Sequence, residues 1–205
     1  MNAEPHIKKG RKYDQVIAGA RDVFMREGFE GASVDVIARD AGVSKATLYS
    51  YFPDKQQLFM AVLRVECDLQ QRAQMDIEFL QRDVPDALHH LAHTMLGLIL
   101  SEPALAMFRV CVGEANRFPE LGQAFYETGP RTAQRQVAEY LQTEKAAAFL
   151  DIENHMEAAD TFMQLCRTDM MLKRLMGIGG RPSDKEINDR AAETVRTFLA
   201  RFRRA

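Results

Sequence analysis

The chain has 205 residues, 46% of them hydrophobic, and its formal net charge is −2. This length and apolar content allow one large domain, or a small domain joined to a medium one, and they exclude wholesale disorder. The near-neutral charge argues against a protein that binds polyanions without any sequence preference.

No segment predicts membrane insertion or secretion. The longest apolar run, Met95 to Leu100, is much shorter than the ~20 residues that cross a bilayer as a helix. The charged start of the chain lacks an apolar signal region. Cys67, Cys111 and Cys166 are widely spaced and form no CxxC pair, a pattern typical of buried thiols in a reducing compartment. We therefore expect a cytoplasmic protein without a membrane segment.

The first predicted helix follows a basic arm that consists of Lys8, Lys9, Arg11 and Lys12. Its apolar residues recur at helical spacing: Tyr13, Ile17, Ala20 and Phe24. Gly28 stands where such a helix would end. A basic arm is usually only a solvated terminus, unless a DNA-binding element follows it.

Two short helices are predicted next. Ser33 can cap the first and Gly42 ends it, while Ser44 caps the second, which stops before a proline. Asp54 and Gln57 have capping-box spacing and open a long helix.

The rest of the chain repeats these start signals without any alternating β pattern or internal repeat. Expected helix starts lie at Asp83 with Pro85, at Pro103, at Pro119, at Asn154 with Glu157, and at Ser183 with Glu186. The helix from Pro119 is expected to be long and kinked at Gly129 and Pro130. The sequence therefore predicts an all-α fold of about nine helices.

The second short helix, "SKATLYSYF", has two contrasting faces. Val43, Leu48 and Phe52 fall on one face and are expected to pack into a core. The opposite face carries small and hydroxylated residues: Ala46 and Ser50 at its centre, flanked by Thr47 and Tyr49, with Lys45 in the first turn. Two short helices joined by a glycine turn, the second with such a face, are typical of a helix-turn-helix that enters the major groove. The alternative from pattern alone is an αα corner with a polar surface.

Residues 12 to 63 resemble the N-terminal domain of TetR/AcrR-family transcriptional regulators. The matching segment is "VIAGARDVFMREGFEGASVDVIARDAGVSKATLYSYFPDKQQLF", with the family's small-residue first helix, its "IA..AGVS" turn, its "LY..F" recognition helix and its "F-P-x-K" exit. The resemblance implies that Ser33 caps a helix and binds a phosphate, that Ser44, Tyr49, Tyr51 and Lys55 bind phosphates, and that Lys45, Ala46, Thr47 and Ser50 face base edges.

Two positions depart from the family pattern. Position 46 is more often Gly, and the Ala46 methyl could contact a thymine methyl. Position 51 is often His, and Tyr51 should keep a phosphate contact without pH dependence. Because this helix has no Arg, Asn or Gln, we expect sequence preference to depend on Lys45, methyl contacts and DNA shape.

The larger remainder of the chain is expected to bind an effector and form the dimer, as the resemblance implies. We predict a helix-turn-helix domain with its basic arm at residues 1–54 and an effector-binding and dimerisation domain at residues 55–205. Met107 to Arg131 further resembles the C-terminal domain of the AefR-like subgroup. Candidate lining residues of an apolar pocket are Met107, Phe108, Cys111, Phe125, Phe162, Met163 and Cys166; ordinary core packing is the alternative for each of them.

Two further patterns could be functional or purely structural. The apolar stripes of the last helices are typical of a dimer bundle or of packing within one chain: Ala158, Phe162, Leu165 and Leu172, then Ala191, Val195, Phe198 and Phe202. His89 and His93 have i,i+4 spacing, but they lack a neighbouring Cys or carboxylate cluster. We therefore expect no metal site, no cofactor and no catalytic residue.

The sequence predicts a homodimeric, ligand-responsive transcriptional regulator, a repressor that a small apolar or aromatic effector releases from a palindromic operator in double-stranded DNA. Two alternatives stay open: an effector-independent DNA-binding protein, acting as an activator or in chromosome organisation, and an all-α enzyme, for which no nucleophile–base pair or phosphate loop is present.

Overall fold

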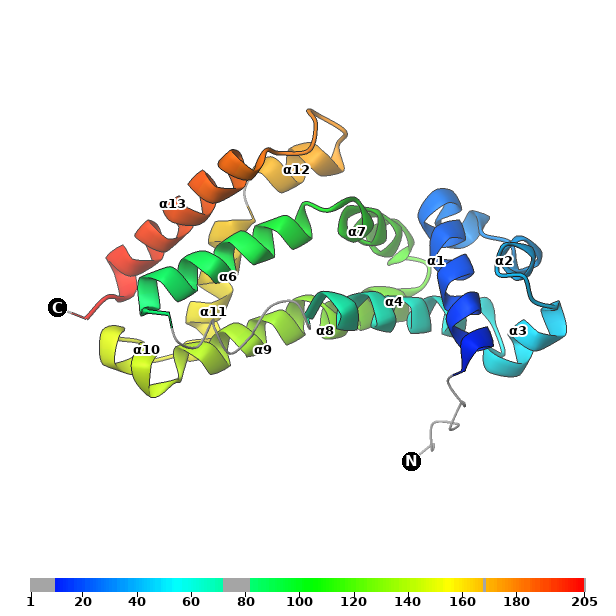
Figure 1. Cartoon of the computed structure of the whole chain (residues 1–205), viewed down its shortest axis with the longest axis horizontal. Coiled ribbons are helices and arrows are strands. Elements are labelled where there is room, and N and C mark those ends of the chain that lie inside the picture. The colour runs from blue at the N-terminus through cyan, green and yellow to red at the C-terminus, as the bar shows by residue number, and fades with distance from the viewer. Residues whose placement is uncertain (1–9, 72–81, 168, 205) are drawn as a thin grey trace. The chain divides into compact units, whose positions relative to one another are not determined.

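The computed structural model describes residues 10–71, 82–167 and 169–204 (Figure 1). In these ranges the chain is helical, and its one β feature is an isolated antiparallel bridge between Leu150 and Arg203. The helices are α1 (Arg11–Gly31), α2 (Val34–Asp40), α3 (Lys45–Tyr51), α4 (Lys55–Gln71), α6 (Val84–Ile99), α7 (Glu102–Glu114), α8 (Pro119–Thr128), α9 (Pro130–Leu141), α10 (Glu144–Phe149), α11 (His155–Cys166), α12 (Asp169–Leu175) and α13 (Asp184–Phe202). The predicted all-α class is confirmed.

The chain divides into two compact units. Unit 1 consists of Met1–Cys67 and Ala106–Phe125, and unit 2 of Asp68–Leu105 and Tyr126–Ala205. Helices far along the chain therefore complete the core around α1 to α4. The functional boundary between residues 54 and 55 stays a prediction, because compactness and function are different criteria.

The core of unit 1 forms around the inward face of α1. Tyr13, Ile17, Ala20 and Phe24 are all buried, as their helical spacing predicted. The Phe24 ring packs edge-on against Phe59, 5.0 Å between centroids. The helix is interrupted at Gly28, whose φ of 73° and ψ of 176° are non-helical. A residue without a Cβ adopts this conformation at little cost.

The predicted caps fix where the helices of unit 1 start. Ser33 Oγ accepts a hydrogen bond from the backbone N–H of Asp35, and Ser44 Oγ accepts one from that of Thr47. Asp54 accepts two bonds from Gln57, one from its backbone and one from its side chain, at 2.7 and 3.3 Å. Each cap satisfies backbone donors that the first helical turn leaves open.

The core of unit 2 forms where α6 lies beside α13 and packs against α11, as the green and red helices of Figure 1 show. The predicted starts at Asp83, Asn154 and Ser183 are confirmed as caps. Ser183 and Glu186 form a complete capping box. No single described helix is long and apolar enough to span a bilayer, and only α6 and α7, taken together across a bend, meet that criterion.

The apolar stripes of the last helices turn inward. Ala158, Phe162, Ala191, Val195 and Phe198 are buried within unit 2. The rings of Phe162 and Phe198 meet edge-on at 5.3 Å. Packing within one chain therefore explains the burial of these five residues, and a dimer bundle formed by the last helices stays a prediction.

The helix prediction differs from the structure in three places. The long helix from Pro119 breaks at the predicted position, Gly129 and Pro130, into two helices, α8 and α9. The short helix α10 was not predicted, and α12 is separate from α11, although the apolar stripe from Ala158 to Leu172 predicted one helix. α10 has six residues with a Thr143 cap, and α12 buries no side chain. Such short or exposed helices lack the long apolar periodicity on which the prediction depended.

Candidate DNA-binding surface

The helix-turn-helix of unit 1 is held together by a turn at Gly42. Gly42 has a φ of 64°, a left-handed conformation that favours glycine. The Val43 N–H donates to the Ala38 carbonyl at 3.0 Å and so ties the turn back to α2. On the other side, Gly19 of α1 packs so closely on this turn that a Cβ there would lie 2.9 Å from the Ala41 Cβ. The turn is therefore fixed by both neighbouring helices.

The helix α3 presents the predicted two faces. Leu48 is fully buried, Phe52 is 2% exposed and Val43 is half-buried. The other face is open: Ser44, Lys45, Ala46, Tyr49 and Ser50 are exposed, and Thr47 and Tyr51 are half-buried. Burial of Leu48 and Phe52 thus fixes the rotation of the helix and directs its polar face outward.

The hydroxyl groups of this face are ordered by bonds within α3. Ser44 and Thr47 share a hydrogen bond of 2.8 Å between their hydroxyls. The Ser50 hydroxyl donates to the Thr47 carbonyl at 2.6 Å. While that bond is kept, Ser50 can offer an outside partner only an acceptor, which suits the amino group of adenine or cytosine.

Tyr51 lies at the edge of this face. Its ring packs edge-on against Tyr13 of α1, with centroids 5.9 Å apart. Tyr13 also lies against Phe52, at 5.4 Å, and burial raises the pKa of the Tyr13 hydroxyl. These contacts hold the Tyr51 ring without enclosing it completely.

Lys55 has partners that the sequence did not indicate. Its ammonium donates to the carbonyls of Glu30 and Ala32, each at 3.1 Å. It also lies 4.9 Å from the centroid of the Phe29 ring. Lys55 therefore closes the carbonyl end of α1, and a phosphate contact would compete with these bonds.

Residues at the end of α7 and just after it contact the same end of α1. Arg117 forms an ion pair with the Glu30 carboxylate at 2.8 Å, and the Glu114 carboxylate accepts from the Glu30 N–H at 3.1 Å. The Phe118 ring packs edge-on against Phe29 at 5.0 Å. Through these contacts Glu114, Arg117 and Phe118 join the end of α7 to the end of α1. Their partners in α1 could not be predicted, because they lie more than 80 residues earlier in the chain.

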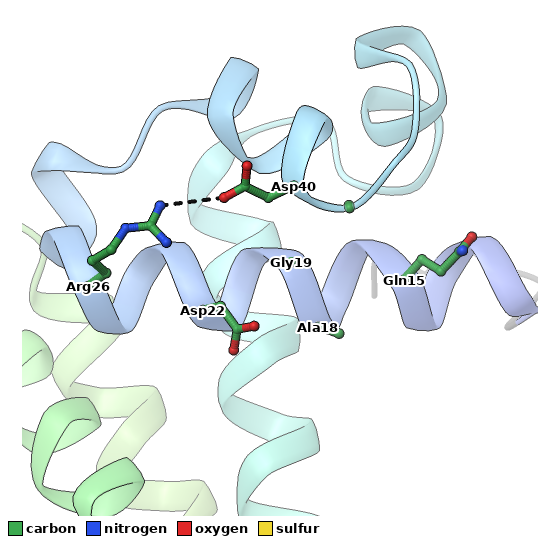
Figure 2. Close-up of a pocket in the computed structure, with 7 residues that line it drawn as sticks. Gln15, Ala18, Gly19, Asp22, Arg26 and Asp40 are labelled. Carbon is green, nitrogen blue, oxygen red and sulfur yellow. Dashed lines mark hydrogen bonds and ion pairs between the residues drawn. The ribbon is translucent and has the colours of Figure 1, made fainter.

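An open groove lies on the side of α1 where Arg26 points toward Asp40 of α2, as Figure 2 shows. The two side chains form an ion pair at 3.5 Å. Gln15, Ala18, Gly19, Asp22 and Ala41 complete the lining. Mixed charges and a shallow shape give this groove no chemistry beyond that of a solvated surface.

The predicted effector residues fall in two separate cores. Met107 and Cys111 are buried in unit 1, where Phe108 and Phe125 are half-buried and their rings lie 6.0 Å apart. In unit 2, three of them are buried: Phe162, Met163 and Cys166. Burial raises the pKa of the Cys166 thiol to about 12. Their role in effector binding stays a prediction.

The histidines of α6 do not gather metal ligands in the described ranges. His89 and His93 stack with ring centroids 6.5 Å apart. No group of three or more metal-ligating side chains was found in the part of the chain that is described.

Comparison with known proteins shows similarity along nearly the whole chain. Residues 16–62 match the family model of bacterial regulatory proteins of the tetR family, and residues 86–204 match that of the AefR-like transcriptional repressor C-terminal domain. The solved structure of the flavonoid-responsive regulator FrrA has a TM-score of 0.81 and 35% identity; the similarity covers 96% of this chain and all of that one.

Two other relatives differ in coverage. A TetR-family regulator structure from Mesorhizobium loti has a TM-score of 0.86 and 25% identity, covering 97% of this chain and all of that one. The curated regulator RutR from Escherichia coli is 43% identical over 58 residues, which are 28% of this chain. The chain thus spans only about a quarter of that curated relative, 27% of its length.

The AefR-like family model matches more than half of the chain, residues 86–204. The tetR-family match at residues 16–62 and the 35% identity to FrrA over its full length indicate the same family. This chain belongs to the TetR family of bacterial regulatory proteins.

Proposed function

We propose that this protein is a cytoplasmic, homodimeric transcriptional repressor that a small molecule releases from a palindromic operator. The observation that carries the proposal is the outward face of α3, with short polar side chains above a fully buried Leu48. Short side chains allow a helix to lie deep in the major groove, and hydroxyls and helix N-terminal amides bind phosphates.

In this proposal, two sets of residues contact DNA. Ser33, Ser44, Tyr49, Tyr51 and Lys55 bind phosphates, and Lys45, Ala46, Thr47 and Ser50 face base edges. Ser33 and Ser44 are exposed caps at two helix N-termini, where backbone amides favour an anion. Lys55 can join them only if its ammonium releases the Glu30 and Ala32 carbonyls.

The dimer is proposed because one recognition helix gives little affinity, whereas a two-fold pair reads two half-sites about 34 Å apart. Unit 2 offers an apolar surface for a second copy: Leu172, Met176 and Ile178 are 55, 66 and 56% exposed. Burying them against their copies would stabilise association. Sedimentation of the Met176→Glu variant tests this, because a dimer as stable as the wild type would place the interface elsewhere.

The proposed effector is a small apolar or aromatic compound. FrrA is described as flavonoid-responsive, and the predicted lining residues are aromatic, Met and Cys side chains, which suit such a molecule. Met107, Phe108, Cys111 and Phe125 belong to one compact unit and Phe162, Met163 and Cys166 to the other. An effector bound in either unit would release DNA only to the extent that it prefers the state that does not bind the operator.

The test is selection of duplexes from a random pool with the purified full-length protein, followed by a screen of flavonoids and other phenolic compounds for release. The proposal predicts one palindromic site and at least one compound that weakens operator binding. Equal affinity for every duplex would contradict the operator, and equal affinity with every bound compound would contradict the effector.

A further inference from the structure

An ion pair links the first turns of α2 and α3. The Lys45 ammonium lies 2.8 Å from the Asp35 carboxylate, and the two side chains are 51 and 70% exposed. The hydrogen bond to Asp35 raises the pKa of Lys45, so the ammonium stays charged. Asp35 was absent from the predicted DNA-binding residues, because a charge in the first turn of a helix usually serves only the helix dipole.

The pair occupies the same surface as the two helix caps. Ser33 Oγ accepts from the Asp35 N–H at 3.3 Å, so Asp35 lies next to the capped start of α2. Lys45 is the first residue of α3 and follows its cap, Ser44, directly. A carboxylate therefore stands among the groups proposed to contact DNA, where a phosphate would repel it.

The base pairs of DNA offer a better partner for this arrangement than the phosphates. In the major groove, guanine presents the acceptors O6 and N7, and its paired cytosine presents an amino donor beside them. An ammonium and a carboxylate 2.8 Å apart provide one donor group and one acceptor group in complementary order. A phosphate backbone offers acceptors alone, so the same pair binds it poorly.

From this geometry we infer that Asp35 is a specificity-determining residue: it holds Lys45 away from phosphates and makes the pair select a G·C base pair in each half-site. The inference rests on the proposed function, since it requires α3 to lie in the major groove. In the absence of Asp35, Lys45 becomes a free point charge that binds any nearby phosphate.

The test compares Asp35→Asn with Asp40→Asn in the full-length protein. Asp40→Asn removes the same charge from the other end of α2, where Asp40 pairs with Arg26 and Arg39, and leaves the Asp35–Lys45 pair intact. Binding to the selected operator and to an unrelated duplex is measured over a salt series, and each variant also undergoes selection from the random pool. Melting curves establish that both variants are folded.

For Asp35→Asn we expect severalfold tighter binding to the unrelated duplex. The slope of log K against log salt becomes steeper by about 1, because Lys45 neutralises one further phosphate. The G·C requirement at one position of each half-site is relaxed. Asp35→Glu keeps the carboxylate and should retain the wild-type slope. Asp40→Asn should shift both duplexes equally and keep the base preference.

Lys45→Ala separates the role of Asp35 from the proposed DNA-binding surface as a whole. If Asp35→Asn behaves like Asp40→Asn while Lys45→Ala changes the base preference, the role of Asp35 is overturned and the recognition surface stands. If Lys45→Ala also leaves affinity and preference unchanged, the proposed DNA surface itself is overturned.

Discussion

The outward faces of α3 in unit 1 and α13 in unit 2 differ in the length of their side chains. α13 exposes long charged residues, and Lys185 pairs with Asp189 one turn away. α3 exposes Ser44, Ala46 and Ser50, whose side chains reach only a short distance from the backbone. Long charged side chains are typical of a surface that stays in water, whereas short ones let another molecule approach the helix closely. Exposure alone thus does not indicate a binding surface, and the short side chains of α3 are what suits the proposed close approach to DNA.

The inward faces differ less, because both units depend on tightly packed aromatic residues. Phe162→Ala should remove the largest amount of stability, about 3–5 kcal/mol, since a fully buried ring leaves a cavity. Chemical denaturation measures the loss. Val112→Ala, at a side chain that is 57% exposed, should change stability by less than about 0.5 kcal/mol. Equal losses for the two variants would contradict the assigned core of unit 2.

The same glycine-to-alanine change should have opposite effects in the two units. At Gly19 a Cβ would lie 2.9 Å from the backbone nitrogen of Ala41, so Gly19→Ala should cost about 1–3 kcal/mol. At Gly97 no atom lies within 4 Å of such a Cβ, and Gly97→Ala should stabilise the helix by about 0.5–1 kcal/mol. Thermal unfolding distinguishes them. Stabilisation by both changes would mean that α1 and the turn at Ala41 pack less closely than described.

Two exposed tyrosines sharpen the comparison of surfaces. Tyr49 and Tyr126 are 43 and 50% exposed, on α3 and α8. Tyr49→Phe should weaken binding to every duplex by about 1 kcal/mol, because it removes one proposed phosphate hydrogen bond. Tyr126→Phe should leave DNA binding unchanged. Equal effects of the two changes, or a Tyr49 effect that depends on base sequence, would count against the phosphate role.

The weakest signal is expected from chemical labelling of the buried Cys166 thiol. Because burial raises its thiol pKa from 9.0 to about 12, the folded protein should leave Cys166 almost unlabelled by iodoacetamide at pH 8. The folded state favours the protonated thiol, so this group contributes stability that is lost as the pH rises from 9.0 toward 12. Mass spectrometry locates the label. Rapid labelling in the folded state would show that Cys166 is accessible to solutes.

Much of the fold followed from local signals. Caps such as Ser44, Asp83 and Ser183 act within one helical turn, so the sequence alone indicates them. The missed α10 has only six residues, too few to show an apolar period. Whether the stripes of α11 and α13 face their own chain or a partner was also undecidable, because both arrangements require the same periodicity.

Of the candidate site, the sequence predicted the two faces of α3 but not the partners of the site's two lysines. The faces of α3 followed from the spacing of Leu48 and Phe52 and from resemblance to a family. The partners of Lys45 and Lys55 did not, because they come from other helices: Asp35 in α2 and the carbonyls at the end of α1. Such contacts depend on tertiary packing, which single-sequence patterns do not contain.

The central claim is that the capped start of α3 contacts DNA, and one pair of variants tests it directly. Asp caps a helix as well as Ser or Asn does, so Ser44→Asp and Asn154→Asp should both fold normally. Each adds one negative charge, the first to unit 1 and the second to unit 2. We predict that Ser44→Asp weakens operator binding by at least about tenfold at low salt through repulsion from phosphates, and that Asn154→Asp leaves it unchanged. Equal operator affinity for the two variants would contradict the claim.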